Sequence, residues 1–431
     1  MTNMPRKVAI VGGNRTPFAR SNTAYRRASN QDLLTAALDG LIARFGLAGK
    51  RLGQVTAGAV MKHSRDFNLT RESVLATALD PATPGIDIQM ACGTGLEAAT
   101  TVANKIALGQ IDAGVAGGSD TTSDAPIAVN EGLRRVLLDL GAAKTAAQRA
   151  KALAGLRPGH ISPVLPATDE PRTGLSMGEH MARTALAFDV TRAEQDAIAA
   201  ASHQKLAAAY ERGFFDDLIT PYLGLTQDNN LRPDSNAEKL AGLRTVFGDP
   251  ETATMTAGNS TPLTDGASTV LLASTEWAEE HNLDPLAWFV DAETAAVDFV
   301  HGDEGLLMAP THAVPRLLAR HDLGLDDFDR VEIHEAFAAT VACTLKAWES
   351  DTYCRDTLGL DGALGSIDPE KINVNGSSLA AGHPFAATGG RILAATAKEL
   401  NELKQREGGT RRALISICAA GGQGVAAIVE A

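Results

Sequence analysis

Aromatic side chains are scarce in this chain of 431 residues, where Phe, Trp and Tyr together make up 4%. Basic residues are also outnumbered, since 52 Asp and Glu against 39 Lys and Arg give a net charge of −13. A protein that binds nucleic acid needs basic residues for the phosphates and often aromatic rings on which bases stack. We therefore expect no nucleic-acid partner, although a local basic pocket for a phosphorylated cofactor stays open.

Cysteines are few, and long apolar runs are missing. The four cysteines include no CxxC pair, which argues against a disulfide framework and against zinc, so we expect no metal. No apolar stretch approaches the length that spans a bilayer, and the first residues, MTNMPRKVAI, carry no signal-peptide core. These absences predict a cytoplasmic protein in a reducing compartment.

The abundant elements are glycine turns between alternating strand and helix patterns, with 41 glycines in the chain. Residues 7–11, 54–60 and 113–117 read as strands, and residues 31–45 as a helix that Gly46 ends. Alternation of this kind is typical of a parallel or mixed sheet with helices on both faces. The first 125 residues therefore predict an α/β fold.

The middle of the chain has a different pattern, and the last part repeats the first. An amphipathic stretch (131–156), a proline-rich loop and helical patterns at 177–188 and 192–211 indicate an insertion. The pattern of residues 41–58 recurs at 317–334, and that around Cys92 recurs at 371–400, which indicates one α/β unit used twice. We predict an N-terminal half (1–125 plus 250–275), an inserted loop domain (126–249) and a C-terminal half (276–431). Two such units meeting face to face would bring their turns together.

Cys92 lies in a tight turn between a predicted strand (86–90) and a helical pattern whose apolar face begins at Leu96. A cysteine at a helix N-terminus is close to unpaired N–H groups, which favour the thiolate over the thiol. The neighbouring Gly93 and Gly95 leave room for a substrate. We interpret Cys92 as a candidate nucleophile; the alternative is a small buried hydrophobe, the role of most free cysteines.

Three more reactive side chains follow predicted strands or lie in glycine turns of the second half. His383 lies in AGHPF, and an imidazole with an ordinary pKa near 6.5 suits it to hold a thiol proton. Cys418 ends the last predicted strand, and His334 follows the strand pattern at 331–333. For each residue alone a structural role is the more common explanation. Their joint position in a duplicated fold favours a catalytic site with a nucleophile, a base and a second acid/base.

Four motifs, in order, resemble those of the thiolase family over nearly the whole chain. The family pattern C-x-S-G-L is matched by CGTGL at 92–96, and N-E-A-F-A by HEAFA at 334–338. G-H-P is matched at 382–384, and C-x-G-G-G-Q-G by CAAGGQG at 418–424. The resemblance implies a five-layered α/β/α/β/α fold, in a homodimer or homotetramer, with coenzyme A as co-substrate and no tightly bound cofactor.

The resemblance also implies roles for these residues in a ping-pong reaction. His383 activates Cys92, which takes an acyl group, while Cys418 protonates the acetyl-CoA enolate and then deprotonates the incoming CoA thiol. One oxyanion hole uses His383 with His334, and the other uses the backbone N–H groups of Cys92 and Ala420; such preorganised donors are what developing oxyanions need. Alignment to the family places coenzyme A against Arg232, Met177, Phe247, Ala257 and Thr261, although each of these is also ordinary as a core or surface residue.

His334 stands where most thiolases have Asn. A His at this position is similar to the degradative branch represented by the β subunit of the trifunctional fatty-acid oxidation complex. GHPFAATGG and CAAGGQG also resemble that degradative branch. The resemblance implies thiolytic cleavage of 3-ketoacyl-CoA, an enoyl-CoA hydratase/3-hydroxyacyl-CoA dehydrogenase partner, and a membrane or partner contact through residues 131–166. A basic amphipathic pattern such as that of 131–166 is more often a solvated helix.

Other functions remain open at this level. A biosynthetic acetoacetyl-CoA thiolase would use the same residues in reverse, and a non-catalytic acyl-CoA carrier would share the fold but is expected to lack Cys92 or Cys418. A condensing ketoacyl synthase shares the fold but has a Cys–His–His site; Cys418 before GGQG argues for the thiolase instead. VAIVGG at 8–13 resembles the start of a dinucleotide fold, but the G-x-G-x-x-G spacing is absent and Pro17 interrupts the expected helix.

Overall fold

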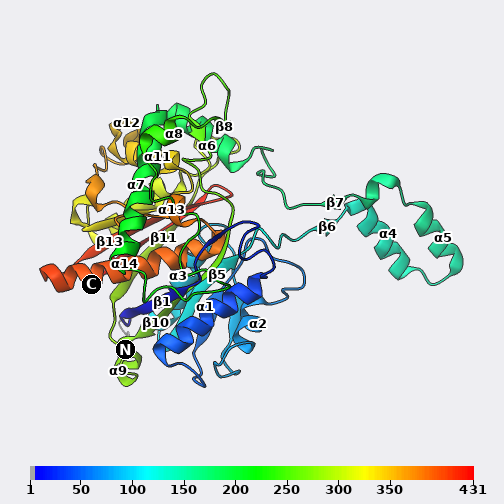
Figure 1. The fold of residues 1–431 in the computed structure, drawn as a ribbon, viewed down its shortest axis with the longest axis horizontal. Helices are drawn as coiled ribbons and strands as arrows, with labels where there is room; N and C mark the ends of the chain where they lie inside the picture. Colours follow the sequence, from blue (N-terminus) through cyan, green and yellow to red (C-terminus); the bar gives the residue numbers. More distant parts are fainter. Residues whose placement is uncertain (1–4) are drawn as a thin grey trace.

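The computed structural model describes residues 5–431; residues 1–4, which open the first predicted domain, lie outside it. Figure 1 shows a body of packed helices and strands, from which one pair of helices projects on a narrow stalk. A 10-stranded sheet, bent around central helices, organises the body. The predicted α/β class is confirmed.

The strands of the two halves pair in the same pattern. In the first half, β1 (Val8–Arg15), β10 (Thr264–Ser274) and β5 (Ala113–Asp120) pair antiparallel, and β5, β3 (Gln54–Ala57) and β4 (Gly85–Asp87) pair parallel. In the second, β11 (Ala287–Ala296), β14 (Gln423–Glu430) and β13 (Arg412–Ala419) pair antiparallel, and β13 pairs parallel with β12 (Arg330–Ile333). This shared order confirms the duplicated unit.

The two half-sheets join along one edge rather than remaining separate. The pairs run from Val8 to Ile10 on β1 and from Phe289 back to Ala287 on β11. Irregular register after Ile10 on β1 and after Phe289 on β11 accompanies this junction, and such bulges bend strands. The expectation of two units meeting face to face therefore needs one correction: their sheets are continuous through β1 and β11.

Helices α3 (Thr94–Ala107) and α14 (Thr388–Glu407) lie between the half-sheets and form the central layer, within a single apolar cluster. Helices α1 (Asn30–Phe45) and α2 (Leu69–Leu75) cover the outer face of the first half, and α10 (Ala309–His321) and α11 (Ala338–Glu349) that of the second. This order of layers is the predicted α/β/α/β/α arrangement.

Alternation along the strands explains why a middle strand is apolar throughout. On β10, Val270 and Leu272 contact the central helices, whereas Leu271 and Ala273 belong to the cluster under α1. Successive side chains of a strand point to opposite faces, so a sheet covered on both sides needs apolar residues at every position. The core therefore lies in two layers, one on each side of the sheet.

The predicted helix ends agree better with the structure than the predicted strand ends. Gly46 ends α1 with a φ of 61°, as expected for a glycine stop. The predicted strand at 86–90 is wrong in length because β4 pairs with β3 only from Gly85 to Asp87, where β3 ends at Ala57. Conversely, β5 runs on to Asp120, since that residue pairs with Gly266 of β10.

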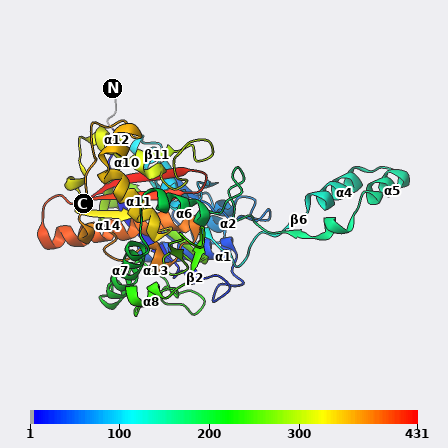
Figure 2. The same ribbon diagram turned by 90° about the horizontal axis from the view of Figure 1, so that it is seen from above.

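The insertion after residue 125 contains two kinds of structure. Its first part is an arm, formed by the two-stranded ribbon of β6 (Ala128–Val129) and β7 (Pro163–Val164) and the helices α4 (Glu131–Ala142) and α5 (Ala146–Ala154). Figures 1 and 2 both show this arm projecting away from the body. Its second part, with α6 (Met177–Ala187), α7 (Arg192–Glu211), α8 (Ala237–Ala241) and β8 (Thr245–Phe247), packs on the body.

The remaining elements are short. They are β2 (Ala19–Arg20), β9 (Met255–Thr256), α9 (Thr275–Glu280), α12 (Asp351–Asp356), α13 (Ser378–Ala381) and the 3-10 turns at Pro158–Ile161, Leu325–Asp327, Pro369–Lys371 and Phe385–Ala387. Among residues 5–431, no helix combines the length and the apolar character needed to cross a membrane.

Candidate active site

Cys92 stands on a turn that the local sequence holds in place. Ala91 adopts a φ of 43°, a left-handed conformation that is uncommon for a residue with a side chain. The Thr94 hydroxyl accepts the N–H of Met90 (2.8 Å) and donates to the carbonyl of Ala91 (2.7 Å), which closes the turn before α3. The turn lifts Cys92 out of the sheet and leaves its side chain partly accessible.

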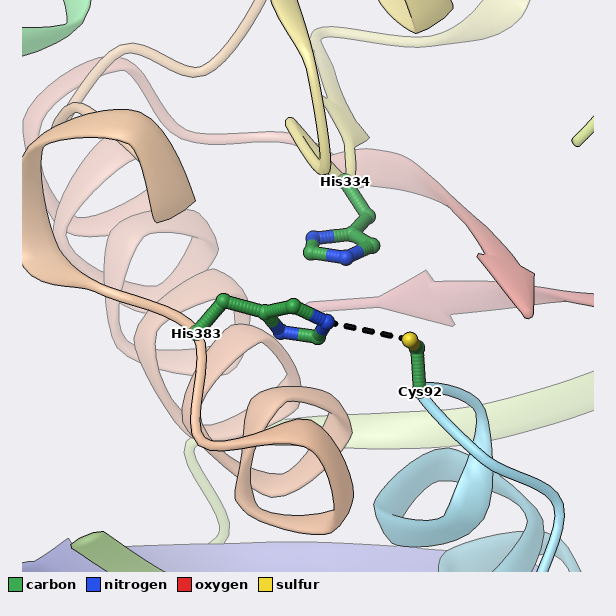
Figure 3. Close-up of side chains that lie close together, drawn as sticks. All are labelled: Cys92, His334 and His383. Atoms are coloured by element: carbon green, nitrogen blue, oxygen red, sulfur yellow. Dashed lines mark hydrogen bonds between the residues drawn. The ribbon is translucent and has the colours of Figure 1, made fainter. Parts of the chain in front are cut away.

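His383 comes from the other half of the molecule and contacts the Cys92 sulfur. Its Nε2 lies 3.0 Å from Cys92 Sγ, as the dashed line in Figure 3 shows. Its Nδ1 lies 2.6 Å from the hydroxyl of Thr388, and its backbone N–H donates to Thr264 Oγ1 over 2.7 Å. Gly382 precedes it with a φ of 102°. The imidazole is therefore fixed on both sides, with one nitrogen free for the thiol.

The protonation state of this pair differs from the expected thiolate and ordinary imidazole. Burial raises the pKa of the Cys92 thiol to about 12, and the charge of Asp120 adds to the shift, although the backbone N–H groups of Ala420 and Cys92 oppose it. Burial, and then the positive charge of Arg391, lowers the pKa of His383 to about 3. The helix N-terminus does not outweigh desolvation, so the resting pair is a neutral thiol beside a neutral imidazole.

His334 completes a compact group with these two side chains. Its ring centre lies 4.3 Å from that of His383, and its side chain is fully buried directly after β12. Nδ1 of His334 lies 2.9 Å from the Ser378 hydroxyl, whereas Nε2 has no partner within residues 5–431. Figure 3 shows both imidazoles beside the cysteine. One donor atom from each of the three side chains falls within 4.8 Å of the others, so the group could also hold a metal ion.

Cys418 lies near the end of β13, opposite Gly424 of β14, and only 2% of its surface is exposed. Burial raises the pKa of its thiol well above the usual range, and a thiolate at Cys92 would raise it further. Gly421 and Gly422, with φ of 79° and 69°, then turn the chain into β14. The backbone N–H of Ala420, directly before this turn, lowers the pKa of the Cys92 thiol. The structure thus brings all four sequence-predicted reactive side chains to one place.

Comparisons with known proteins show which family the chain belongs to. The family model described as "Thiolase, N-terminal domain" matches residues 8–276, and "Thiolase, C-terminal domain" matches residues 283–431. A 3-ketoacyl-CoA thiolase of Serratia proteamaculans is 41% identical over 98% of this chain and 97% of its own length. This chain belongs to the thiolase family.

Two solved structures place this thiolase among close relatives in fold. The crystal structure of human mitochondrial 3-ketoacyl-CoA thiolase in complex with CoA has a TM-score of 0.80 at 27% identity and covers 99% of this chain and 98% of that one. The Bacillus anthracis acetyl-CoA acetyltransferase has a TM-score of 0.80 at 29% identity, with both chains covered completely. The resemblance seen in the four motifs is confirmed.

The residues that the family alignment places against coenzyme A do not all lie in the same surroundings. Met177 and Phe247 are half-buried beside the cluster that contains Cys418, and the Phe247 ring lies 6.0 Å from that of Phe337. Thr261 donates through its N–H and its hydroxyl to the carbonyl of Ala336. The other two, Ala257 and Arg232, lie at the surface, and the N–H of Arg232 donates to His203 Nδ1.

Sequence analysis missed several polar residues that support the candidate site. Asp120 accepts the N–H groups of Val60, Met61 and Ala386, so it ties the turn after His383 to the first half. Burial raises the pKa of its carboxyl to about 7. The available signal was an acidic residue at the end of an otherwise uncharged strand.

A second group of missed residues contacts the Nδ1 atoms of the two imidazoles or supports those contacts. Thr388 contacts His383 and Ser378 contacts His334, while Arg391 donates to the hydroxyls of Ser377 (3.1 Å) and Ser378 (3.0 Å). A hint lay in the sequence, because these polar residues sit within a few positions of the G-H-P motif among apolar neighbours. Which ring each one contacts depends on the tertiary structure.

Proposed function

We propose that this chain catalyses the thiolytic cleavage of 3-ketoacyl-CoA to acetyl-CoA and a shortened acyl-CoA through an acyl-enzyme on Cys92. The contact of 3.0 Å between Cys92 Sγ and His383 Nε2 carries this proposal, because it pairs a nucleophile with its base across the two halves. The family and the relatives named 3-ketoacyl-CoA thiolase support the substrate class. The activity is that of an acyltransferase.

In the first half-reaction, the Cys92 thiol gives its proton to His383 Nε2 as the sulfur attacks the 3-keto carbon. The bond between C2 and C3 then breaks, and its electron pair forms the enolate of acetyl-CoA. The acyl group stays on Cys92. Cys418 donates the proton that converts this enolate to acetyl-CoA. A thiol held protonated by burial suits this role, since the enolate is a strong base.

In the second half-reaction, the Cys418 thiolate takes the proton of the incoming CoA thiol. The CoA sulfur attacks the thioester on Cys92, and we assign the tetrahedral oxyanion to the backbone N–H groups of Cys92 and Ala420, both of which lower the pKa of the Cys92 thiol. Collapse of this intermediate releases acyl-CoA, and the Cys92 sulfur regains its proton from His383. The enolate oxygen of the first half-reaction is assigned to His334 and His383.

For coenzyme A we propose a site along Met177, Phe247, Ala257 and Thr261, with Arg232 near the adenine end. Apolar contact from Met177 and Phe247 beside the Cys418 cluster suits the pantetheine arm. The surface position of Arg232 suits a phosphate-bearing group. The human relative solved in complex with CoA supports a CoA-binding protein in general. We propose no tightly bound cofactor.

Intact-mass spectrometry tests the reaction directly. The protein is mixed with acetoacetyl-CoA without free CoA, beside Cys92→Ala as a control. We expect one acetyl adduct that maps to Cys92, is absent from the control and disappears on adding CoA. A long-chain 3-ketoacyl-CoA should leave the shortened acyl group on the same residue. The absence of any adduct would leave a thiolase-shaped acyl-CoA carrier.

The chain-length dependence of kcat/KM separates the two remaining thiolase activities. A biosynthetic acetoacetyl-CoA thiolase uses the same residues, and one structural relative is an acetyl-CoA acetyltransferase. We expect kcat/KM for thiolysis to rise with acyl length up to medium or long chains. A preference for acetoacetyl-CoA over every longer substrate would instead assign the chain to the biosynthetic activity.

We propose that the arm of residues 128–164 makes peripheral contact with an anionic membrane. Nine of the nineteen large hydrophobic side chains that are exposed in the structure lie between residues 127 and 165, among them Ile127, Leu138 and Ile161. The arm also carries six basic and two acidic side chains within a chain of net charge −13. Exposed apolar side chains beside positive charge are typical of an interfacial segment.

Flotation with vesicles tests the arm. We expect the protein to float with vesicles that contain anionic lipid and not with neutral ones. Leu137→Glu together with Leu138→Glu should abolish flotation, since both side chains are about half exposed on α4. Leu108→Glu, on a leucine of the body that is even more exposed, is the control. Unchanged flotation of the α4 variant would contradict this proposal.

We propose a homodimer, or a tetramer of such dimers, formed through the free edge of the sheet. Within residues 5–431, strand β4 ends the strand order and pairs on one side only, with β3. Beside it lie exposed apolar side chains, with Phe67 at 91% and Ile86 at 37% exposure. Free edges of this kind favour pairing with another copy. Sedimentation velocity should show a dimer that Phe67→Glu weakens.

The enoyl-CoA hydratase/3-hydroxyacyl-CoA dehydrogenase partner that the family resemblance implies stays a prediction.

A further inference from the structure

The two imidazoles beside Cys92 have opposite tasks in the proposed reaction. His383 must accept the thiol proton, so its Nε2 needs a lone pair. His334 must donate to an oxyanion, so its Nε2 needs a hydrogen. Both rings are neutral because burial lowers both pKa values. A neutral imidazole has only one N–H, so the two rings must adopt opposite tautomers, and something in the structure must select them.

The contacts of His383 fit the acceptor at Nε2. The thiol of Cys92 has a single hydrogen, which points at Nε2 when the pair is ready to react. Nδ1 then carries the ring hydrogen and donates it to Thr388 Oγ1, 2.6 Å away. Thr388 is fully buried, so this hydroxyl is held in place. The tautomer of His383 is the one that a general base requires.

The contacts of His334 fit the opposite tautomer. Nδ1 of His334 lies 2.9 Å from the Ser378 hydroxyl, and Nε2 finds no partner in the described part of the chain although the ring is completely buried. A buried polar atom without a partner is uncommon and costs free energy. Figure 3 shows this ring close to that of His383 and to the Cys92 sulfur. The unpartnered nitrogen therefore belongs to the reaction site.

Arg391 determines the direction of the hydrogen bond between Ser378 and His334. Its Nη2 lies 3.0 Å from Ser378 Oγ, and a guanidinium can only donate. Ser378 Oγ accepts this hydrogen, and its own hydrogen is then available for His334 Nδ1. In the reverse arrangement, with His334 Nδ1 donating, the Ser378 hydrogen would have no acceptor among the contacts of the described residues.

We propose that Ser378 and Arg391 are positioning residues that hold His334 as its Nε2–H tautomer, ready to donate to the oxygen of the reacting thioester or enolate. This inference rests on the proposed function of the site. It also explains why a histidine at this position needs such support. The Asn found in most thiolases carries a permanent N–H donor, whereas a neutral imidazole can carry its hydrogen on either nitrogen.

Nitrogen-15 NMR of histidine-labelled protein tests the tautomer without reference to activity. The signal of His334 is identified by its loss in His334→Asn. We expect a hydrogen on Nε2 in the wild type and a shift toward Nδ1–H in Ser378→Ala. Ser377→Ala is the matched control, because it removes the other hydroxyl that Arg391 contacts and leaves the bond to His334 intact. Ser378→Thr keeps the hydroxyl and should keep the tautomer.

A double-mutant cycle tests whether Ser378 acts through His334. We expect Ser378→Ala to lower kcat by roughly 10- to 100-fold, which is less than the roughly 100- to 1,000-fold loss of a whole oxyanion donor, with little change in KM. In the His334→Asn background the same substitution should cost less than about threefold, since an amide has no tautomer to select.

The outcomes separate this inference from the proposed function. Nδ1–H at His334 in the wild type, or an equal loss from Ser378→Ala in both backgrounds, would overturn the inference even if Cys92 becomes acylated. If Cys92 is never acylated, the proposed reaction fails, and the spectrum of the wild type still decides the tautomer. If Ser378→Ala does not fold, the wild type and Ser378→Thr carry the test.

Discussion

At the scale of single residues, the proposed nucleophile Cys92 would become a thiolate only during the reaction. Burial keeps Cys92 as a thiol and His383 as a neutral imidazole, although the two are 3.0 Å apart. Two ions in this place would gain Coulomb energy and lose hydration, and the second effect is larger in a buried site. A neutral pair also keeps Cys92 protected from oxidants, because only the thiolate is reactive.

The neutral pair predicts an unusual pH dependence of Cys92 alkylation. A thiol whose pKa is raised to about 12 stays protonated at neutral pH, and a histidine whose pKa is lowered to about 3 stays neutral there. Between about pH 6 and 9, the rate with iodoacetamide should therefore rise about tenfold per pH unit without a plateau. Peptide mapping identifies the labelled site, and Cys92→Ala is the control.

A plateau above about pH 6 to 7 would contradict this prediction, since it would indicate a thiolate–imidazolium pair. The other three cysteines are buried and should contribute little label in the folded protein. For the same reason, kcat/KM for thiolysis should show no acidic limb near about pH 6.5, the value at which an ordinary histidine would gain its proton.

The same three side chains predict inhibition by zinc. Cys92, His334 and His383 offer a sulfur and two nitrogens within 4.8 Å of one another, which suits a tetrahedral ion with one open position. Binding would displace the Cys92 proton, so inhibition should strengthen as the pH rises. We expect Zn²⁺ to compete with acyl-CoA and EDTA to restore activity. His334→Ala should weaken inhibition at least about tenfold, because loss of even an outer-shell partner of a ligand costs about 10- to 100-fold in metal affinity.

Zinc inhibition that is unchanged in His334→Ala would show that the ion binds the Cys92–His383 pair alone or a different site. The comparison must use residual activity relative to each variant without zinc, because His334 also belongs to the oxyanion hole proposed above. Isothermal titration with one equivalent of bound ion in the wild type provides a readout that does not depend on turnover.

At the scale of elements, the close approach of α3 and α14 sets the distance between Cys92 and His383, the proposed nucleophile and base. A Cβ on Gly95 would lie 2.7 Å from the carbonyl oxygen of Ala386 and 2.7 Å from the backbone nitrogen of Gly390. A Cβ on Gly389 would clash with the backbone of Leu96. Both glycines are needed because the two helix starts approach backbone to backbone. Cys92 and His383 each lie just before one of these starts.

Gly389→Ala should therefore separate Cys92 from His383 as well as destabilise the protein. Forcing a methyl group between two backbones costs about 1–3 kcal/mol of unfolding free energy. A displacement of about 1 Å at the reacting atoms lowers the rate by about 100-fold. Single-turnover acetylation of Cys92 measures the rate, and thermal unfolding measures the stability.

Gly141→Ala on α4 is the matched control for that substitution. Among the described residues, no atom lies within 4 Å of the place that a Cβ on Gly141 would take, and alanine is the better helix former. The stability and the acetylation rate of this variant should match or slightly exceed those of the wild type. Acetylation of Gly389→Ala at the wild-type rate would show that the helix crossing does not set the distance between the two side chains.

Local signals were enough for elements whose ends are fixed by neighbouring residues. Helix α7 has the predicted bounds, 192–211, because Thr191 and Glu194 form a capping box at its start. Strand ends were predicted less well, since β4 and β5 end where distant partners stop pairing. The four reactive residues followed from turn motifs. The supporting residues Thr388, Ser378 and Arg391, and the shifted pKa values, depend on contacts between the halves.

At the scale of the whole molecule, the site belongs to neither half alone. Cys92 comes from the first half-sheet and its helix, whereas His334, His383 and Cys418 come from the second. The pairing of β1 with β11 and the shared core around α3 and α14 hold the two groups together. Separately folded halves would each lack either the nucleophile or its base. Duplication of one unit thus produced a site that neither copy contains.

The arm, by contrast, contributes little to this body. Val136 is the buried residue of α4, and α5, which the structure describes in full, has none. The contacts of the arm are internal, since Val136 faces Gly155 and Gly132 lies against the His160 ring. A segment that buries so little apolar surface stabilises the fold only slightly. The arm is therefore separable from catalysis, which makes its removal informative.

Replacing residues 130–162 by an Asn-Gly turn, which joins the paired residues Val129 and Pro163 of the ribbon, should leave the catalytic body intact. We expect the melting temperature to change by no more than about 2 °C. Because the arm lies outside the catalytic group, kcat/KM for acetoacetyl-CoA should stay close to that of the full chain. Flotation with anionic vesicles should be lost. A shortened protein that unfolds early or loses thiolysis would show that the arm supports the site, in which case its exposed apolar residues serve the folded body and not a membrane.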